Sequence, residues 1–166
     1  TGIRKTPPCR ITPYVRGRRL FPRALGPNAE GDFGISALEA FLLIEDIALV
    51  RQRWSPVTVK FEDDAVADHF DHYDDRGYQI EQFGRIWVHT HPGASASPSS
   101  TDEATLGRCF RGNHWAVMFI LAKGGETYVR LAINAGPGAE LMMAVGVYVS
   151  FPVGASQAPA CKSQTM

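Results

Sequence analysis

Cysteine is scarce in this chain of 166 residues: only Cys9, Cys109 and Cys161 occur, far apart from one another. This odd, scattered set predicts neither a disulfide framework nor a cysteine-based zinc site. Long apolar runs are also missing, because no stretch reaches transmembrane length without interruption, and the start carries no secretory pattern. We therefore expect a cytoplasmic protein without a membrane segment. The start at Thr1 rather than Met is consistent with a missing or processed N-terminal segment.

Net charge is formally zero, but the two signs are segregated along the chain. The basic residues that precede the first acidic residue are Arg4, Lys5, Arg10, Arg16, Arg18, Arg19 and Arg23. A later segment is acidic, with Glu62, Asp63, Asp64, Asp68, Asp71, Asp74 and Asp75. A basic arm could contact nucleic acid or an acidic partner. No aromatic residues alternate with these charges, so a solvated face or pairing within the fold is favoured and nucleic acid is not expected as a partner.

Length and composition predict one compact domain, since 166 residues with 45% hydrophobic content can bury a sizeable core. We expect an N-terminal arm over residues 1–10, a domain over 11–151 and a flexible tail over 152–166. Alternating strand and helix patterns predict an α/β sandwich with a mixed sheet. The expected elements are an amphipathic, helix-like segment at 11–25, strands at 33–36, 41–52, 58–61 and 86–91, helices from 63 to Gly77 and from 99 to 109, and strands at 114–122, 126–134 and 141–151.

A cluster of metal-binding residue types follows the strand Ile86–Val88. Side chains two apart on a strand share a face, so His89 and His91 are expected side by side. Pro92 and the loop over 93–98 end the strand, and the residues from Ser99 begin a helix with Asp102 in its first turn. Two imidazoles and one carboxylate leave the fourth position of a tetrahedral Zn²⁺ open, which is typical of a catalytic site.

Two plainer interpretations compete with the metal site. Ser99 with Asp102, like Ser100 with Glu103, has the spacing of a capping box, so these residues could serve only to start the helix. The two strand histidines could be ordinary half-buried residues. A rival metal group is formed by His69 and His72, with Asp68 and Asp71 beside them, but a solvated helix face is the favoured interpretation there.

The motif extends further than the three ligands. Seven residues separate His91 from Ser99, and Ser99-x-x-Asp102 follows. This arrangement resembles the signature of the JAMM (MPN+) zinc metalloproteases, most closely a prokaryotic type, specifically over 86–106 and diffusely over about 11–151. The resemblance implies a single-domain α-β-α sandwich with a mixed, curved sheet (MPN/JAB, cytidine-deaminase-like) and one Zn²⁺ per chain. It implies His89, His91 and Asp102 as ligands, with Ser99 helping to hold the tetrahedral intermediate through its hydroxyl.

The same family uses an upstream glutamate as the general base, in a Glu-x-Gly-Gly-like stretch that enters a strand. Glu30 is the matching residue here, but its spacing to Phe33-Gly34-Ile35 is one residue short. A slip of one residue turns a strand side chain to the other face unless a bulge absorbs it. Ala29 could therefore occupy the base position, Asp32 and Glu45 are lesser candidates, and Glu30 could be a turn carboxylate.

The resemblance implies a zinc-dependent isopeptidase that hydrolyses amide or isopeptide bonds at the C-terminal tail of ubiquitin or a ubiquitin-like protein. Glu30 would take a proton from water and pass it to the leaving amine. Two other classes stay open. A non-catalytic scaffold of the same fold is favoured if Glu30 is misplaced. A DNA-associated protein similar to the RadC type is suggested by Pro98-Ser99, with the basic N-terminal arm as its only further support.

Overall fold

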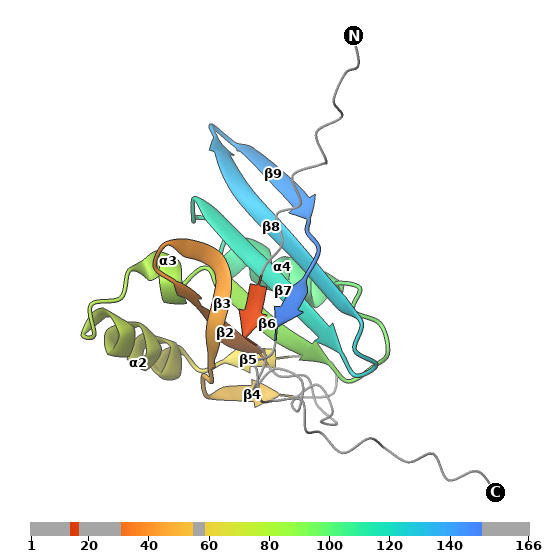
Figure 1. The fold of residues 1–166 in the computed structure, drawn as a ribbon, viewed down its shortest axis with the longest axis horizontal. Helices are drawn as coiled ribbons and strands as arrows, with labels where there is room; N and C mark the ends of the chain where they lie inside the picture. The colour runs from red at the N-terminus through yellow and green to blue at the C-terminus, as the bar shows by residue number, and fades with distance from the viewer. Residues whose placement is uncertain (1–13, 17–30, 55–58, 151–166) are drawn as a thin grey trace, which may run out of the picture.

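The computed structural model describes residues 14–16, 31–54 and 59–150 (Figure 1). Within these ranges the chain is of the α/β class, as predicted. Its strands are β1 (Tyr14–Arg16), β2 (Gly31–Ala37), β3 (Ala40–Ala48), β4 (Gln52–Trp54), β5 (Val59–Phe61), β6 (Ile86–His91), β7 (Trp115–Ala122), β8 (Thr127–Gly136), β9 (Ala139–Ala144) and β10 (Tyr148–Ser150). Its helices are α2 (Asp63–Asp74), α3 (Ile80–Phe83) and α4 (Ser100–Cys109).

Eight of these strands form one mixed sheet in the order β10-β1-β3-β2-β6-β7-β8-β9. The pairs β6–β7, β1–β3 and β1–β10 are parallel, and the other neighbours are antiparallel. Strands β6 and β7 are almost entirely buried, and β7 is apolar throughout, as expected for strands covered on both faces. The remaining strands, β4 and β5, pair as a separate two-stranded ribbon. The predicted mixed sheet is therefore confirmed.

The sheet curls strongly from one edge to the other. Its two edge strands, β9 and β10, are separated in the sequence only by residues 145–147. That connection can reach about 14 Å, whereas the edges of a flat eight-stranded sheet lie about 34 Å apart. The Val145 N–H first donates to the Val129 carbonyl, and the chain then crosses to the far edge (Figure 1). One face of the sheet is therefore concave and lined by the strands themselves.

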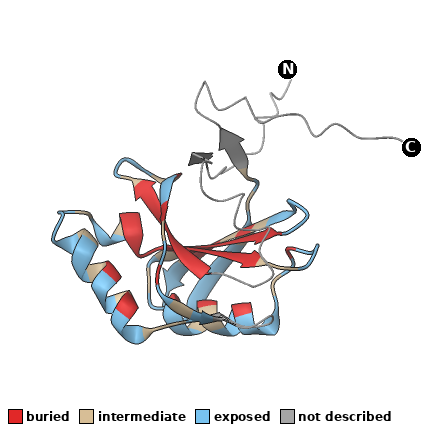
Figure 2. Ribbon diagram, turned by 90° about the horizontal axis from the view of Figure 1, so that it is seen from below, coloured by how far each residue is buried: buried red, intermediate tan, exposed pale blue. Residues whose placement is uncertain are grey.

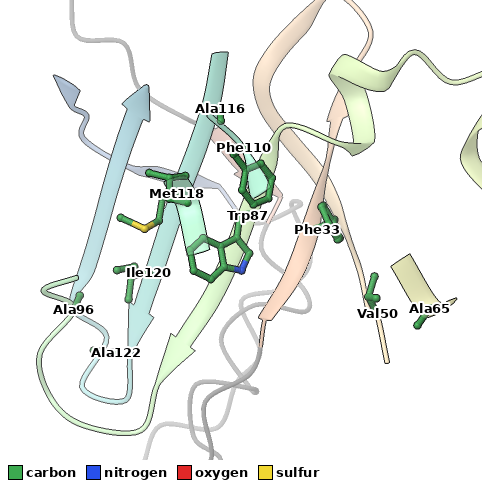
Figure 3. Packing of buried hydrophobic residues seen from close by; sticks show 11 residues of the cluster. Phe33, Val50, Ala65, Trp87, Ala96, Phe110, Ala116, Met118, Ile120 and Ala122 are labelled. Carbon is green, nitrogen blue, oxygen red and sulfur yellow. The ribbon is translucent and has the colours of Figure 1, made fainter. Parts of the chain in front are cut away.

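Two clusters of buried residues occupy the two faces. The inner core comprises Ile44, Ile47, Ile86, Val88, Val117, Phe119, Leu121, Val129 and Leu131, all from strands. The outer core comprises Phe33, Val50, Ala65, Trp87, Ala96, Leu106, Phe110, Ala116, Met118, Ile120 and Ala122 (Figure 3). Helices α2 and α4 bury Ala65 and Leu106 in the outer core and leave most of their other residues exposed (Figure 2). A helical layer on the inner-core side, which the predicted α-β-α sandwich requires, is not found in residues 14–16, 31–54 and 59–150.

Helix α2 begins at Asp63 and is followed by Gly77, whose φ of 76° marks the expected stop. Asp63 and Asp64 lie in the first turn and do not cap the helix, because the N-cap position is Glu62. Their negative charges still suit the positive end of the helix dipole. The single-turn helix α3 was not predicted from the sequence.

Three other expectations need correction or lie outside the described residues. The helix-like segment at 11–25 is wrong at residues 14–16, which form β1, and its other residues are outside the description. The expected last strand at 141–151 is two strands, β9 and β10, on opposite edges of the sheet. The predicted arm at 1–10 and tail at 152–166 are not described. No helix in the described ranges is both long and apolar enough to cross a membrane.

Candidate metal centre

His89 and His91 lie at the end of β6 and point to the outer-core face, as their spacing predicts. Their ring centroids are 5.2 Å apart. His89 is 3% exposed and stacks on Trp87 at 4.2 Å, while His91 is partly exposed. The aromatic ring of Trp87 thus restrains one histidine in the apolar layer, and the second reaches toward solvent.

Asp102 reaches this pair from the first turn of α4. Its Oδ1 lies 3.2 Å from Nε2 of His89, and its Oδ2 lies 3.3 Å from Nε2 of His91. The predicted approach of Asp102 to the two histidines is therefore confirmed. The capping box is confirmed as well, since the Asp102 N–H donates to Ser99 Oγ at 3.2 Å and the Ser99 N–H donates to Asp102 Oδ2 at 2.6 Å. The cap and the histidine contacts coexist, and the cap holds the carboxylate in place.

The dimensions of this group fit a small tetrahedral cation. One ligand atom from each of His89, His91 and Asp102 can be chosen so that all lie within 4.8 Å of one another. Zinc bonds of about 2.0–2.1 Å place neighbouring ligands of a tetrahedron about 3.3 Å apart. Each histidine Nε2 lies at about that separation from one oxygen of Asp102, His89 at 3.2 Å from Oδ1 and His91 at 3.3 Å from Oδ2.

Hydrogen bonding gives a second test of the fit. Both ring nitrogens of His89 are buried, and neither makes a well-aligned hydrogen bond to a described residue, although Nε2 lies 3.2 Å from Asp102 Oδ1. A buried polar atom without a partner is unfavourable by about 1–3 kcal/mol. We therefore expect a bound group, such as a cation, to contact one of the His89 ring nitrogens. In His91, Nδ1 lies 3.1 Å from the Ser95 carbonyl oxygen, which can only accept. Nδ1 therefore carries a proton, and Nε2 is the ring nitrogen that faces the Asp102 carboxylate.

Protonation states in the group also suit a metal. Burial lowers the pKa of His89, which favours a neutral imidazole. The contact with Asp102 raises the pKa of His91, against the opposing effect of partial burial. Burial alone would raise the pKa of Asp102, but the two imidazoles and the Ser99 N–H hold it well below the usual range. The ionised Asp102 and the neutral His89 are therefore in the state that binds cations, whereas His91 loses its second ring proton when a cation binds.

The described part of β2 supplies no carboxylate to this face. Gly31 is the residue directly opposite His89, and Asp32 is opposite Val88, so the Asp32 side chain lies on the inner-core face. Glu45 is exposed on β3, which β2 separates from β6. Both lesser candidates for the base are therefore misplaced. Glu30, the favoured base, and Ala29 lie outside the described residues.

The rival pair on α2 does not form a metal site. His69 is buried and stacks on Phe33 at 4.6 Å, and its Nε2–H donates to the Phe83 carbonyl oxygen at 3.1 Å. His72 is exposed and contacts Arg76. Among the side chains that the structure describes, His89, His91 and Asp102 form the only group of three or more suitable ligands. The favoured alternative, a solvated face, is right for His72 and wrong for His69, which belongs to an aromatic cluster.

The turn between β7 and β8 makes hydrogen bonds to His91 and to the loop after it, which the sequence analysis did not predict. The Lys123 N–H lies 3.0 Å from both the His91 and the Gly93 carbonyl oxygens, and the Ala96 N–H donates to Glu126 Oε2 at 3.0 Å. These contacts arise because β6 and β7 are parallel neighbours, with His91 opposite Ala122. No local pattern at Lys123 or Glu126 indicates this register.

Comparison with known proteins gives no relative. A scan against models of protein families finds no match for this chain, and a search of curated proteins finds none either. The motif spacing and the geometry of His89, His91 and Asp102 therefore carry the functional argument.

Proposed function

We propose that this protein is a zinc-dependent hydrolase of amide or isopeptide bonds, of the JAMM (MPN+) type, acting in the cytoplasm. The observation that carries the proposal is the convergence of His89, His91 and Asp102 from a strand end and the following helix, at the separations of one tetrahedral cation. The uninterrupted spacing from His91 to Ser99 and Asp102 supports it independently.

The chain's own donors indicate which cation it takes. His89 and His91 would bind through Nε2 and Asp102 through a carboxylate oxygen, a set of borderline-soft nitrogens and one hard oxygen that suits Zn²⁺ better than Ca²⁺ or Mg²⁺. Three protein ligands leave a fourth position open. When bound, zinc supplies a Lewis acid that lowers the pKa of water to about 7 and polarises a substrate carbonyl.

Ser99 is positioned to support the reaction through its hydroxyl. Its Oγ accepts a hydrogen bond from the Asp102 N–H, so the hydroxyl proton stays available for donation. The residue is exposed, beside the buried Asp102. We assign Ser99 the stabilisation of negative charge that develops on the substrate oxygen.

For the substrate, we propose the C-terminal tail of ubiquitin or a ubiquitin-like protein, joined to a lysine or a peptide. The motif resemblance is the basis of this assignment. Gly31 supports it, because the position opposite His89 presents no side chain to an approaching chain.

The proposed base is Glu30, which takes the proton of water and transfers it to the leaving amine. A second function, a metal-binding scaffold that does not cleave, is favoured by one observation. On the metal-facing side, β2 presents Gly31 opposite His89, and its nearest carboxylate, Asp32, faces the inner core. The two functions differ only in whether a carboxylate outside the described residues reaches the site.

Turnover of a defined substrate tests the proposal. The full chain is incubated with zinc and with ubiquitin, or a ubiquitin-like protein, carrying a fluorogenic amine on its C-terminus. Wild type is expected to release the amine, Asp102→Ala to lose both zinc and turnover, and Glu30→Gln to keep zinc and lose turnover. If Glu30→Gln cleaves as fast as wild type, the base is wrongly assigned. If zinc-loaded wild type releases no amine, the scaffold function holds instead.

A further inference from the structure

A loop connects the histidines of the centre to Asp102. It runs from Pro92 to Pro98 and connects the ligand His91 to the cap of α4. Within the loop, Ala96 is 0% exposed and belongs to the outer core with Ile120 and Ala122. The turn between β7 and β8 also contacts the loop, through the Lys123 N–H and the Glu126 side chain.

One peptide group in this loop has partners at both ends. The Ser95 carbonyl oxygen accepts a hydrogen bond from Nδ1–H of His91 at 3.1 Å. The N–H of the same peptide unit, on Ala96, donates to Glu126 Oε2 at 3.0 Å. A peptide unit is planar, so its C=O and N–H are fixed relative to each other. Glu126 and His91 are therefore joined through a single rigid group.

The backbone of Glu126 is itself fixed in the turn. The Ala122 N–H donates to the Glu126 carbonyl oxygen at 2.9 Å, and the Gly125 N–H donates to the Ala122 carbonyl oxygen at 2.9 Å. Gly125 adopts a φ of 85°, the left-handed conformation that such a turn favours. The carboxylate thus extends from a stable hairpin end toward the loop.

We propose that Glu126 is a positioning residue for His91, acting through the Ser95–Ala96 peptide group. The proposal rests on the proposed function, since it assigns a role in holding the metal ligand. Histidine ligands commonly donate their second ring N–H to a carboxylate or carbonyl, which fixes the tautomer and the ring orientation. Here the Ser95 carbonyl accepts directly from His91, and the Glu126 carboxylate accepts from the N–H of the same peptide group.

The effect of Glu126 follows from hydrogen-bond cooperativity. A carboxylate that accepts from the peptide N–H polarises that peptide and makes its carbonyl oxygen a better acceptor. The stronger Ser95 carbonyl holds the proton of His91 on Nδ1 and leaves Nε2 free to bind the metal. Loss of Glu126 then loosens the loop and lets the ring change tautomer and orientation.

Two measurements distinguish whether Glu126 positions the His91 ring or only stabilises the loop. The first is zinc affinity, measured by competition with a chromophoric chelator, for wild type, Glu126→Ala, Glu126→Gln and the control Glu39→Ala. Glu39 is an exposed glutamate in the turn between β2 and β3. Loss of a direct outer partner of a metal ligand weakens metal binding by about 10–100-fold, so for Glu126→Ala, which acts through one further peptide group, we expect a loss near the lower end, about tenfold. We expect a smaller loss for Glu126→Gln, whose amide oxygen still accepts, and none for Glu39→Ala.

The second readout is the tautomer of the neutral His91 ring in metal-free protein, from the ¹⁵N shifts of its ring nitrogens recorded at alkaline pH. Wild type and Glu39→Ala are expected to show the Nδ1–H form, and Glu126→Ala a mixture of the two tautomers. A Glu126→Ala protein that melts earlier but keeps wild-type zinc affinity and the Nδ1–H tautomer would overturn the inference. If wild type binds no zinc, the proposed function fails, while the tautomer comparison still decides whether Glu126 acts on His91.

Discussion

At the scale of single residues, Asp102 joins the start of a helix to the candidate metal centre. Its Oδ2 accepts from the Ser99 N–H at 2.6 Å and lies 3.3 Å from Nε2 of His91. The same carboxylate therefore has a structural role and a proposed role as a metal ligand. The Ser99 Oγ accepts from the Asp102 N–H in return, so one hydroxyl serves both the helix cap and the proposed catalytic role of Ser99. Substitutions at Ser99 can separate these two roles.

Two substitutions at Ser99 make that separation. Ser99→Ala is expected to lower the free energy of unfolding by about 1 kcal/mol, whereas Ser99→Gly lowers it by only a few tenths, since glycine is a tolerable N-cap. Both remove the hydroxyl. Denaturant unfolding and substrate turnover are measured for each. Equal loss of turnover in the two variants supports a role for the hydroxyl itself. If Ser99→Ala loses more turnover than Ser99→Gly, in proportion to its lower stability, Ser99 acts only as a helix cap.

His69 is expected to make stability depend on pH. Burial lowers its pKa below the usual 6.5, and the neighbouring His72 lowers it further, while the hydrogen bond to the Phe83 carbonyl opposes both. The unfolded chain therefore binds more protons than the folded one just below pH 6.5, so stability falls as pH decreases from there. Denaturant unfolding between pH 7.5 and 5 should show a shallower decrease for His69→Gln. An unchanged slope would contradict this assignment.

Residues close in the sequence were the predictable part of the site. His89, His91, Ser99 and Asp102 lie in one strand–loop–helix segment, so strand alternation and capping rules were enough to bring them together. Glu126 is 30 residues from its partner Ala96, and only the register of β6, β7 and β8 brings it there. No rule of local spacing contains that information.

At the scale of elements, β2 and β6 approach each other at a position that only glycine fits. A Cβ added to Gly34 would lie 2.7 Å from Cγ2 of Ile86, a fully buried side chain. Gly107 in α4 is different, because an added Cβ meets nothing closer than 4.0 Å. The strand glycine is required by packing, and the helix glycine is not.

These two glycines give a matched pair of substitutions. Gly34→Ala is expected to lower the free energy of unfolding by about 1–3 kcal/mol, because the inner core must move to accept a methyl group. Gly107→Ala is expected to raise it by up to about 1 kcal/mol through higher helix propensity. Urea unfolding measures both. Equal effects of the two changes would show that the close approach of β2 and β6 is not real.

The sequence predicted the elements that have a long hydrophobic pattern. It did not predict elements whose structure depends on pairing with strands distant in the sequence. Strand β7 is a long continuous apolar run and helix α2 has a clear helical period, and both occur where expected. The three-residue β1 has no such pattern, and it is a strand because β3 and β10 flank it. Both partners are distant in the sequence, so local propensity could not reveal the pairing.

At the scale of the whole molecule, the curl of the sheet separates an inner core made of strands from an outer core that α2 and α4 cover. The centre lies on the outer face, where α4 crosses the end of β6 and carries Asp102 to the histidines. The mixed sheet was predictable from alternating patterns. Its closure was not, because it depends on the short connection between strands at opposite edges.

The metal content of the purified full chain shows whether the fold assembles one metal site. After incubation with zinc and removal of the excess, elemental analysis is expected to find about one zinc per chain in wild type. The double variant His89→Ala/His91→Ala is expected to hold none while keeping the same circular dichroism spectrum. A folded wild type that retains no zinc, or a double variant that retains as much as wild type, would contradict the account.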